Sequence, residues 1–317
     1  MTQGTTQPEQ QAEEEIPDGS RDHSGEPRRP NADLFADPPA EIGNIITADS
    51  TLDQGKTERS MSSRLAMAAG ISVACIVVFT LIGMAYDKNR DGDFVQIIGY
   101  IIAVVLFPIV LQMTRFKAKC SYVGDRGIVL YTLKGSRHAE PLGEMLLFDA
   151  VSELHVSQTR QFMNGVYTGT SYSYTWIDDD RKVHYKLGGN YHSKQGNPKR
   201  SDAWHFAHSA ELSWSNYYLK VAAEQLDKLG YIEFRIDKRR FLRLGPGFIE
   251  FHFGGDPVRV TVEEIATVTL DNGMFGFRHK DAKWYSGSGK FNFSYTSMAN
   301  PMVFLLALEK LMGFSWN

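Results

Sequence analysis

Seven residues, DKNRDGD, carry oxygen-bearing side chains at the spacing of the first half of a calcium-binding loop. Asp87, Asn89 and Asp91 take loop positions 1, 3 and 5, a glycine takes position 6, and Asp93 follows. Position 12, where such a loop needs a bidentate glutamate, is Ile98. The same composition is typical of a polar reverse turn. Two interpretations therefore stay open, a calcium site and a turn.

Patterns for other chemistry are missing. The chain has no GxSxG, P-loop, HExxH or GxGxxG motif. His205, His208 and Glu211 lie at helical spacing, but such a set is not specific for a metal. Two cysteines, Cys75 and Cys120, are too few for a disulfide framework or a cysteine-ligated zinc. We expect no enzymatic activity, no cofactor and no metal beyond the calcium candidate.

Basic residues form two groups that could contact anionic lipid headgroups or a protein segment, or simply face solvent. They are Arg115, Lys117 and Lys119, and Lys238, Arg239, Arg240 and Arg243. Each Lys or Arg near an anionic leaflet contributes about 1 kcal/mol of binding. The net charge of −3 and the lack of a concentrated basic and aromatic face argue against nucleic acid as a partner.

The first basic group directly follows two apolar runs, 65–86 and 94–113, that contain no charged residue. Each run has about the 20 residues that a helix needs to cross a bilayer core of about 30 Å. The short linker permits only a turn, so the sequence predicts a transmembrane helical hairpin within 61–117. Ala66, Gly70 and Ala74 form a stripe of small residues that favours close packing against the second span or a neighbouring copy.

The bases that flank the runs predict the orientation of the hairpin. Lys56, Arg59 and Arg64 precede the first run, and three bases follow the second. The linker holds only Lys88 and Arg90, among three aspartates. Because basic flanks stay in the cytoplasm, we expect both termini there.

The segment before the hairpin, residues 1–60, has 13 acidic and 5 basic residues and one aromatic residue, Phe35. Such a segment buries too little apolar area to offset the entropy of ordering it. We therefore expect a disordered acidic tail.

The segment after the hairpin alternates apolar and polar residues, as in 171–176 and 291–295, which is typical of strands. Helical periodicity is confined to 216–230 and 300–313. The same order of strands followed by one helix occurs twice. We interpret 118–231 and 232–317 as two copies of one module, the first with a polar insertion at 188–201.

The strand that begins Tyr122-Val-Gly-Asp-Arg-Gly-Ile, the strand that follows Phe148-Asp-Ala-Val and the single closing helix resemble bacterial pleckstrin-homology-like domains. The resemblance implies a mainly-β (α+β) barrel of about seven strands closed by a C-terminal helix. In that family such domains often accompany two membrane helices, which implies a multi-pass protein of the bacterial inner membrane. The expected fold is thus a two-helix transmembrane hairpin with tandem barrels.

These features predict a non-enzymatic, membrane-anchored binding or scaffold protein that presents two domains to the cytoplasm. Its partners would be the bilayer and either anionic lipid headgroups or a protein segment. The alternative is a ligand-gated membrane sensor or effector that forms homo-oligomers through its hairpin.

Overall fold

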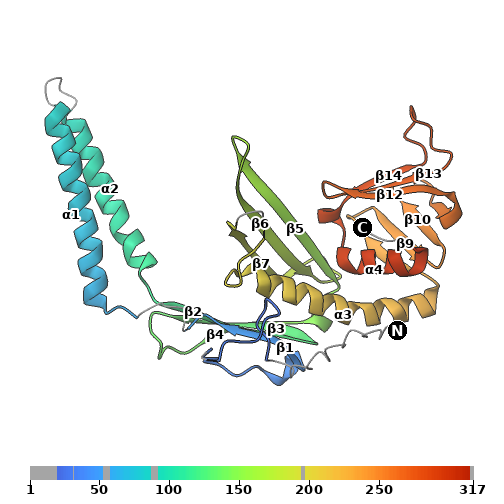
Figure 1. Ribbon diagram of the computed structural model, residues 1–317, viewed down its shortest axis with the longest axis horizontal. Helices are drawn as coiled ribbons and strands as arrows, with labels where there is room; N and C mark the ends of the chain where they lie inside the picture. The colour runs from blue at the N-terminus through green and yellow to red at the C-terminus, as the bar shows by residue number, and fades with distance from the viewer. Residues whose placement is uncertain (1–19, 31, 53–57, 87–91, 194–196, 315–317) are drawn as a thin grey trace, which may run out of the picture.

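The chain forms a helical hairpin at one end of a β-rich body (Figure 1). The computed structural model describes residues 20–30, 32–52, 58–86, 92–193 and 197–314. The body has two four-stranded sheets, two three-stranded sheets and two long helices within these residues.

The hairpin consists of α1 (Met61–Tyr86) and α2 (Gly92–Met113). Both helices are long and apolar enough to cross a membrane, as the sequence predicts. They touch where Ala68 and Ala103 are buried and where the Ser72 hydroxyl donates to the Ala103 carbonyl at 3.1 Å. At Gly99 a Cβ would lie 2.4 Å from Cβ of Phe79, so only glycine permits this approach.

The hairpin lies between two strands that are partners in one sheet. The sheet has the order β1-β2-β3-β4, and β1 pairs antiparallel with β2. Its strands are β1 (Ile45–Ser50), β2 (Lys117–Gly124), β3 (Gly127–Lys134) and β4 (Leu142–Leu147). The chain therefore leaves the sheet at Ser50, forms α1 and α2, and returns to the neighbouring position at Lys117.

The expectation of disorder over 1–60 is wrong for the described part of this segment. Residues 45–50 form β1, and Ile42 is fully buried with Cys120, Tyr122 and Val129 of the sheet. The Tyr122 hydroxyl also donates to the Ala36 carbonyl at 2.5 Å. A few apolar side chains suffice because the sheet supplies the rest of the core.

A three-stranded sheet and a helix complete the first half. They are β5 (Glu153–Met163), β6 (Val166–Ile177), β7 (Val183–Tyr191) and α3 (Trp204–Leu229). The predicted aromatic alternation is confirmed in β6, where Tyr172, Tyr174 and Trp176 are buried. They pack with Trp214 of α3 and Phe148 in one core.

The second half contains a four-stranded sheet, a three-stranded sheet and α4 (Pro301–Met312). The first sheet has β8 (Ile232–Arg235), β9 (Phe241–Gly245), β10 (Phe248–His252) and β11 (Val258–Thr261). The second has β12 (Ile265–Asp271), β13 (Met274–His279) and β14 (Lys290–Ser294). Phe304 of α4 meets the rings of Phe234 and Phe275 edge-on, each at 5.2 Å.

Helix α3 and Asn300 both join the halves. Helix α3 contributes Trp214 to the first core and Ala222 to the second. Asn300, with a left-handed φ of 53°, accepts hydrogen bonds from the Leu154 N–H at 2.8 Å and the Trp214 indole N–H at 2.9 Å. Because Asn300 is buried, loss of its side chain would leave two buried donors unsatisfied.

The sheets and the start of α3 also differ from the sequence prediction. No sheet closes into a barrel within the described residues; each half instead has two separate sheets. Helix α3 begins at Trp204, well before the predicted 216. Its first half buries polar residues, among them Ser209, Glu211 and Ser213, which breaks the apolar periodicity.

We call the described residues before β1 (20–30 and 32–44) the N-terminal arm. The role of this arm and of β1 can be tested with two truncations. A chain that begins at Ser20 keeps every contact described above, whereas one that begins at Thr51 lacks β1 and Ile42. Burial of one large aliphatic side chain contributes about 1.5–3 kcal/mol, and an uncovered β2 edge promotes aggregation. We expect only the shorter chain to lose its monodisperse peak in size-exclusion chromatography in detergent. Equal behaviour of the two chains would contradict the role of β1.

Candidate functional site

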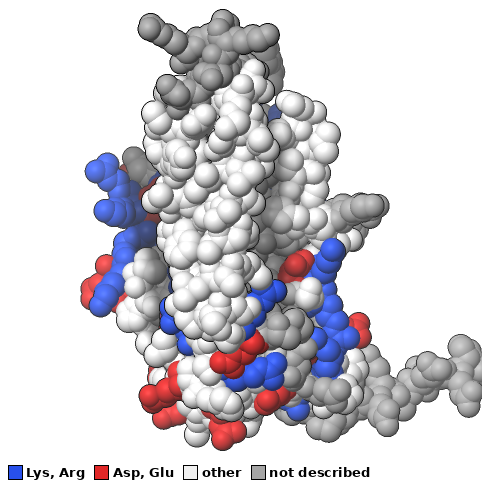
Figure 2. Space-filling model, turned by 90° about the vertical axis from the view of Figure 1, so that its left-hand side faces the viewer, with Lys and Arg blue, Asp and Glu red and all other residues white. Residues whose placement is uncertain are grey.

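The first basic group lies where the second apolar helix meets the sheet. Arg115 lies in the link between α2 and β2, and Lys117 and Lys119 are exposed on one face of β2. Phe116 and Ala118 alternate with them and are buried. Figure 2 shows Lys and Arg side chains, with some acidic ones, around the lower end of the hairpin, whose surface above them is white. This strand therefore presents positive charge next to the candidate membrane spans.

The second basic group is distant from the first, at the end of the molecule away from the hairpin (Figure 1). Asp237 accepts hydrogen bonds from the backbone of Arg239 and Arg240 and from the Arg240 side chain at 2.6 Å. These bonds, the Arg239 bond first, lower the pKa of Asp237 to about 2. The charge of Arg240 is thus balanced locally.

The charge of Arg243 is balanced by carboxylates as well. It lies in β9 and forms ion pairs with Glu233 at 3.2 Å and Glu250 at 3.6 Å. Among the described residues only Lys238 and Arg239 of this group are exposed and form no ion pair. Half of the second group, Arg240 and Arg243, therefore pairs with carboxylates of its own half of the chain.

The small-residue stripe faces away from α2. Ala66, Gly70 and Ala74 are exposed, and a Cβ at Gly70 would meet nothing within 4 Å. The interpretation that the stripe packs against the second span is therefore wrong. Packing against a neighbouring copy stays a prediction.

Most of the calcium candidate lies outside the described part of the chain. Asp87, Asn89 and Asp91 lie outside the described residues. The backbone of Asp93 belongs to the first turn of α2, and its side chain is not among the described ones.

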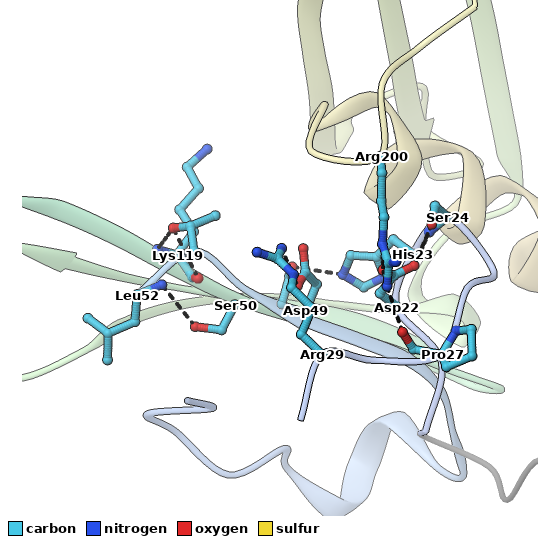
Figure 3. Close-up of polar contacts among 12 residues, drawn as sticks. Asp22, His23, Ser24, Pro27, Arg29, Asp49, Ser50, Leu52, Lys119 and Arg200 are labelled. Carbon is cyan, nitrogen blue, oxygen red and sulfur yellow. Dashed lines mark hydrogen bonds and ion pairs between the residues drawn. The ribbon is translucent and has the colours of Figure 1, made fainter. Parts of the chain in front are cut away.

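A polar network holds the N-terminal arm against the start of α3 (Figure 3). Arg200 donates to the buried Asp22 carboxylate and to the Pro27 carbonyl, each at 2.6 Å. Asp22 also accepts from the Ser24 backbone and hydroxyl. Burial alone would raise the pKa of Asp22, but the bonds from Ser24 and Arg200 outweigh burial and hold the pKa below its usual value.

His23 lies at the centre of this network. Its ring nitrogens are 2.8 Å from the Thr47 hydroxyl and 2.9 Å from the Ser121 hydroxyl, and Thr47 is 2.8 Å from the Ser209 hydroxyl. Burial lowers the pKa of His23 to about 3, so the ring is neutral at physiological pH. A neutral ring donates one hydrogen bond and accepts the other, so one side chain ties the arm to β1, β2 and α3.

Beside His23 is a cavity of about 120 Å³. Lys119, Arg200 and His205 are among its lining residues. The Nε2 atom of His205 is buried and has no hydrogen-bond partner among the residues that the structure describes. The cavity is lined as well by Asp49, whose pKa is raised, first by burial. Such a lining can hold a small polar molecule.

Sequence reasoning missed this pocket. Asp22, His23 and Asp49 belong to the segment expected to be disordered, and no local pattern connects them to Arg200. The two histidines that the sequence placed at helical spacing have different surroundings. His208 contacts Glu211 at 3.2 Å, whereas His205 lines the cavity. Within the described part of the chain, no three His, Cys, Asp or Glu side chains are grouped to hold a metal ion.

Comparison with known proteins adds no assignment, since no family model and no curated protein matches the chain.

The low pKa of His23 makes docking of the arm sensitive to acid. An unfolded histidine takes up a proton near pH 6.5, whereas the folded one resists until about pH 3. The stabilisation is therefore complete above about pH 6.5 and is lost as pH falls, by about 2 kcal/mol between pH 7 and pH 5. Urea unfolding and hydrogen exchange of residues 20–29 at the two pH values measure this loss.

The control is His23→Gln, which keeps hydrogen-bonding capacity but does not titrate. We expect this variant to lose much less stability between the two pH values. If it loses as much as the wild type, His23 is not the group responsible.

Proposed function

We propose that the protein is a non-enzymatic, membrane-anchored binding module that presents two pleckstrin-homology-like domains to the cytoplasm for recognition of a protein segment or of lipid headgroups. The observation that carries the proposal is the position of the apolar hairpin between the paired strands β1 and β2.

This position fixes the distance between the body and the membrane. Only three residues separate Met113 at the end of α2 from Lys117 at the start of β2. Three extended residues span at most about 11 Å. If the hairpin crosses a bilayer, the first sheet is held at the bilayer surface, which suits recognition of membrane-bound partners.

The order of elements supports the resemblance to pleckstrin-homology-like domains. In each half, four strands in sequential order are followed by three strands and one helix: β1–β4, β5–β7 and α3, then β8–β11, β12–β14 and α4. We infer a duplicated module whose first copy accepts the hairpin between its first two strands. This inference extends the first module to include β1, outside the predicted range 118–231.

Open sheet edges support binding to a protein segment. β4 is an edge strand of its sheet, and its first four residues are exposed. An extended peptide can add to such an edge through backbone hydrogen bonds. Recognition in this way needs no catalytic group.

Alkaline extraction and tag accessibility test the proposal together. We expect the full chain to stay in the pellet after carbonate washing of membranes. We also expect N-terminal and C-terminal tags to be cleaved only when vesicles expose their cytoplasmic face, because the flanking bases favour that side. Release of the chain by carbonate, or tags on opposite sides, would contradict the proposal.

The cavity beside His23 favours a second candidate, a ligand-gated sensor. Its lining includes Thr51, directly after β1, and Lys119 of β2, so a bound molecule would contact both strands that hold the hairpin. The exposed stripe at Ala66, Gly70 and Ala74 is available for contact between copies.

Thermal shift measurements with inorganic phosphate and a nucleotide panel test the second candidate. A ligand that binds only the folded state raises the melting temperature as its concentration rises. We expect Lys119→Gln to reduce this shift and Lys117→Gln, which lies outside the cavity lining, to preserve it. A protein that responds to no compound and gives no crosslinked oligomer in membranes excludes the sensor.

A further inference from the structure

We infer that six basic side chains around the membrane end of the sheet form a binding surface for anionic phospholipid headgroups. The inference deepens the proposed function and rests on it. We call this surface the basic collar and define it by Arg59, Arg64, Arg115, Lys117, Lys134 and Arg137.

The collar combines three parts of the chain at one place. Arg64 near the start of α1 donates to the Leu111 carbonyl of α2 at 2.5 Å, so the two helix ends meet there. Arg137, in the turn after β3, lies 6.0 Å over the ring of Phe116 next to β2. The guanidinium of Arg115 lies 3.6 Å from a Cβ built at Gly135 of the same turn. Arg59, Arg64, Lys134 and Arg137 were not in the predicted set of contact residues.

The pairing of β2 with β3 places two like charges opposite each other. Lys117 and Lys134 are register partners, and both are exposed on the same face of the sheet. Like charges at directly opposite positions destabilise a sheet. Neither lysine forms an ion pair with a described residue, so the protein itself supplies no described counter-charge at this pair.

None of the six collar side chains forms an ion pair within the described residues. Glu58 accepts a hydrogen bond from the Arg137 backbone at 3.1 Å, and this bond is the first cause of the lowered pKa of Glu58. This bond involves the backbone of Arg137 and leaves its guanidinium available. An anion from outside the chain can therefore approach the six collar side chains.

The position of the collar indicates which kind of anion it binds. Arg115 and Lys117 lie within four residues of the end of α2, where a spanning helix meets the headgroup layer. Phosphate groups of lipids are the anions at that level, and each nearby base contributes about 1 kcal/mol of attraction. Lys119 lines the cavity beside His23, and the second basic group is remote, so neither belongs to the collar.

Lipid titration of the detergent-solubilised full chain tests the collar. Bound lipids are counted by native mass spectrometry during titration with phosphatidylglycerol and, separately, with phosphatidylcholine. We expect tighter binding of phosphatidylglycerol. The double variant K117Q/K134Q should weaken it about five-fold for each lysine removed, the fold-change equivalent to about 1 kcal/mol. The matched control K238Q/R239Q removes two exposed charges elsewhere and should bind like the wild type.

A second measurement separates lipid binding from damage to the fold. In phosphatidylcholine nanodiscs, K117Q/K134Q should melt at the same temperature as the wild type or higher, because the repulsion between the lysines is relieved. In nanodiscs that also contain phosphatidylglycerol, the wild type should gain more stability than the variant.

Three outcomes would overturn the collar: equal binding of the two lipids, unchanged phosphatidylglycerol affinity in the double variant, or an equal loss in the control. These failures differ from failure of the proposed function, which appears as release by carbonate. If the chain stays in the membrane after carbonate washing but shows no lipid preference, only the collar is refuted and the proposed function stands.

Discussion

Five registered residue pairs join β1 to β2, and both apolar helices lie between these strands in the chain. Closing so long a loop costs conformational entropy. A helical hairpin reduces that cost, because packed helices hold their ends about 8–10 Å apart, which is only about twice the strand spacing of about 4.8 Å. The first sheet and the hairpin thus stabilise each other: the ladder holds the helix ends together, and the helices bring the strands into register.

The arm before β1 strengthens this connection. Ile42 fills one face of the sheet, while His23 bonds to hydroxyls on two strands and indirectly to α3. Arg200 fixes the same arm from the segment that precedes α3. Sheet, arm and helix therefore form one body at the base of the hairpin, and α3 passes from this body into the core of the second half.

The sequence could predict features that depend on neighbouring residues. The two apolar helices follow from uninterrupted apolar runs, and β6 follows from its alternating aromatic residues. β1 could not be predicted, because its partner β2 lies beyond both helices and its own surroundings are acidic. β9 was not predicted, because it begins within a cluster of basic residues. In the structure Arg243 alternates with the buried Leu242 and Leu244 and pairs with carboxylates from β8 and β10. The pocket beside His23 depends on contacts between segments that are distant in the sequence, so no sequence motif predicts it.

The interruption of the first sheet has a consequence during synthesis. β1 leaves the ribosome before the hairpin, and its partner β2 is made only after both apolar helices. At about 5–20 residues per second, the stretch from Ser50 to Lys117 takes roughly 3–13 seconds to translate. Throughout that interval the nascent β1 lacks its partner strand β2, so the β1–β2 ladder forms only after the whole hairpin has been synthesised.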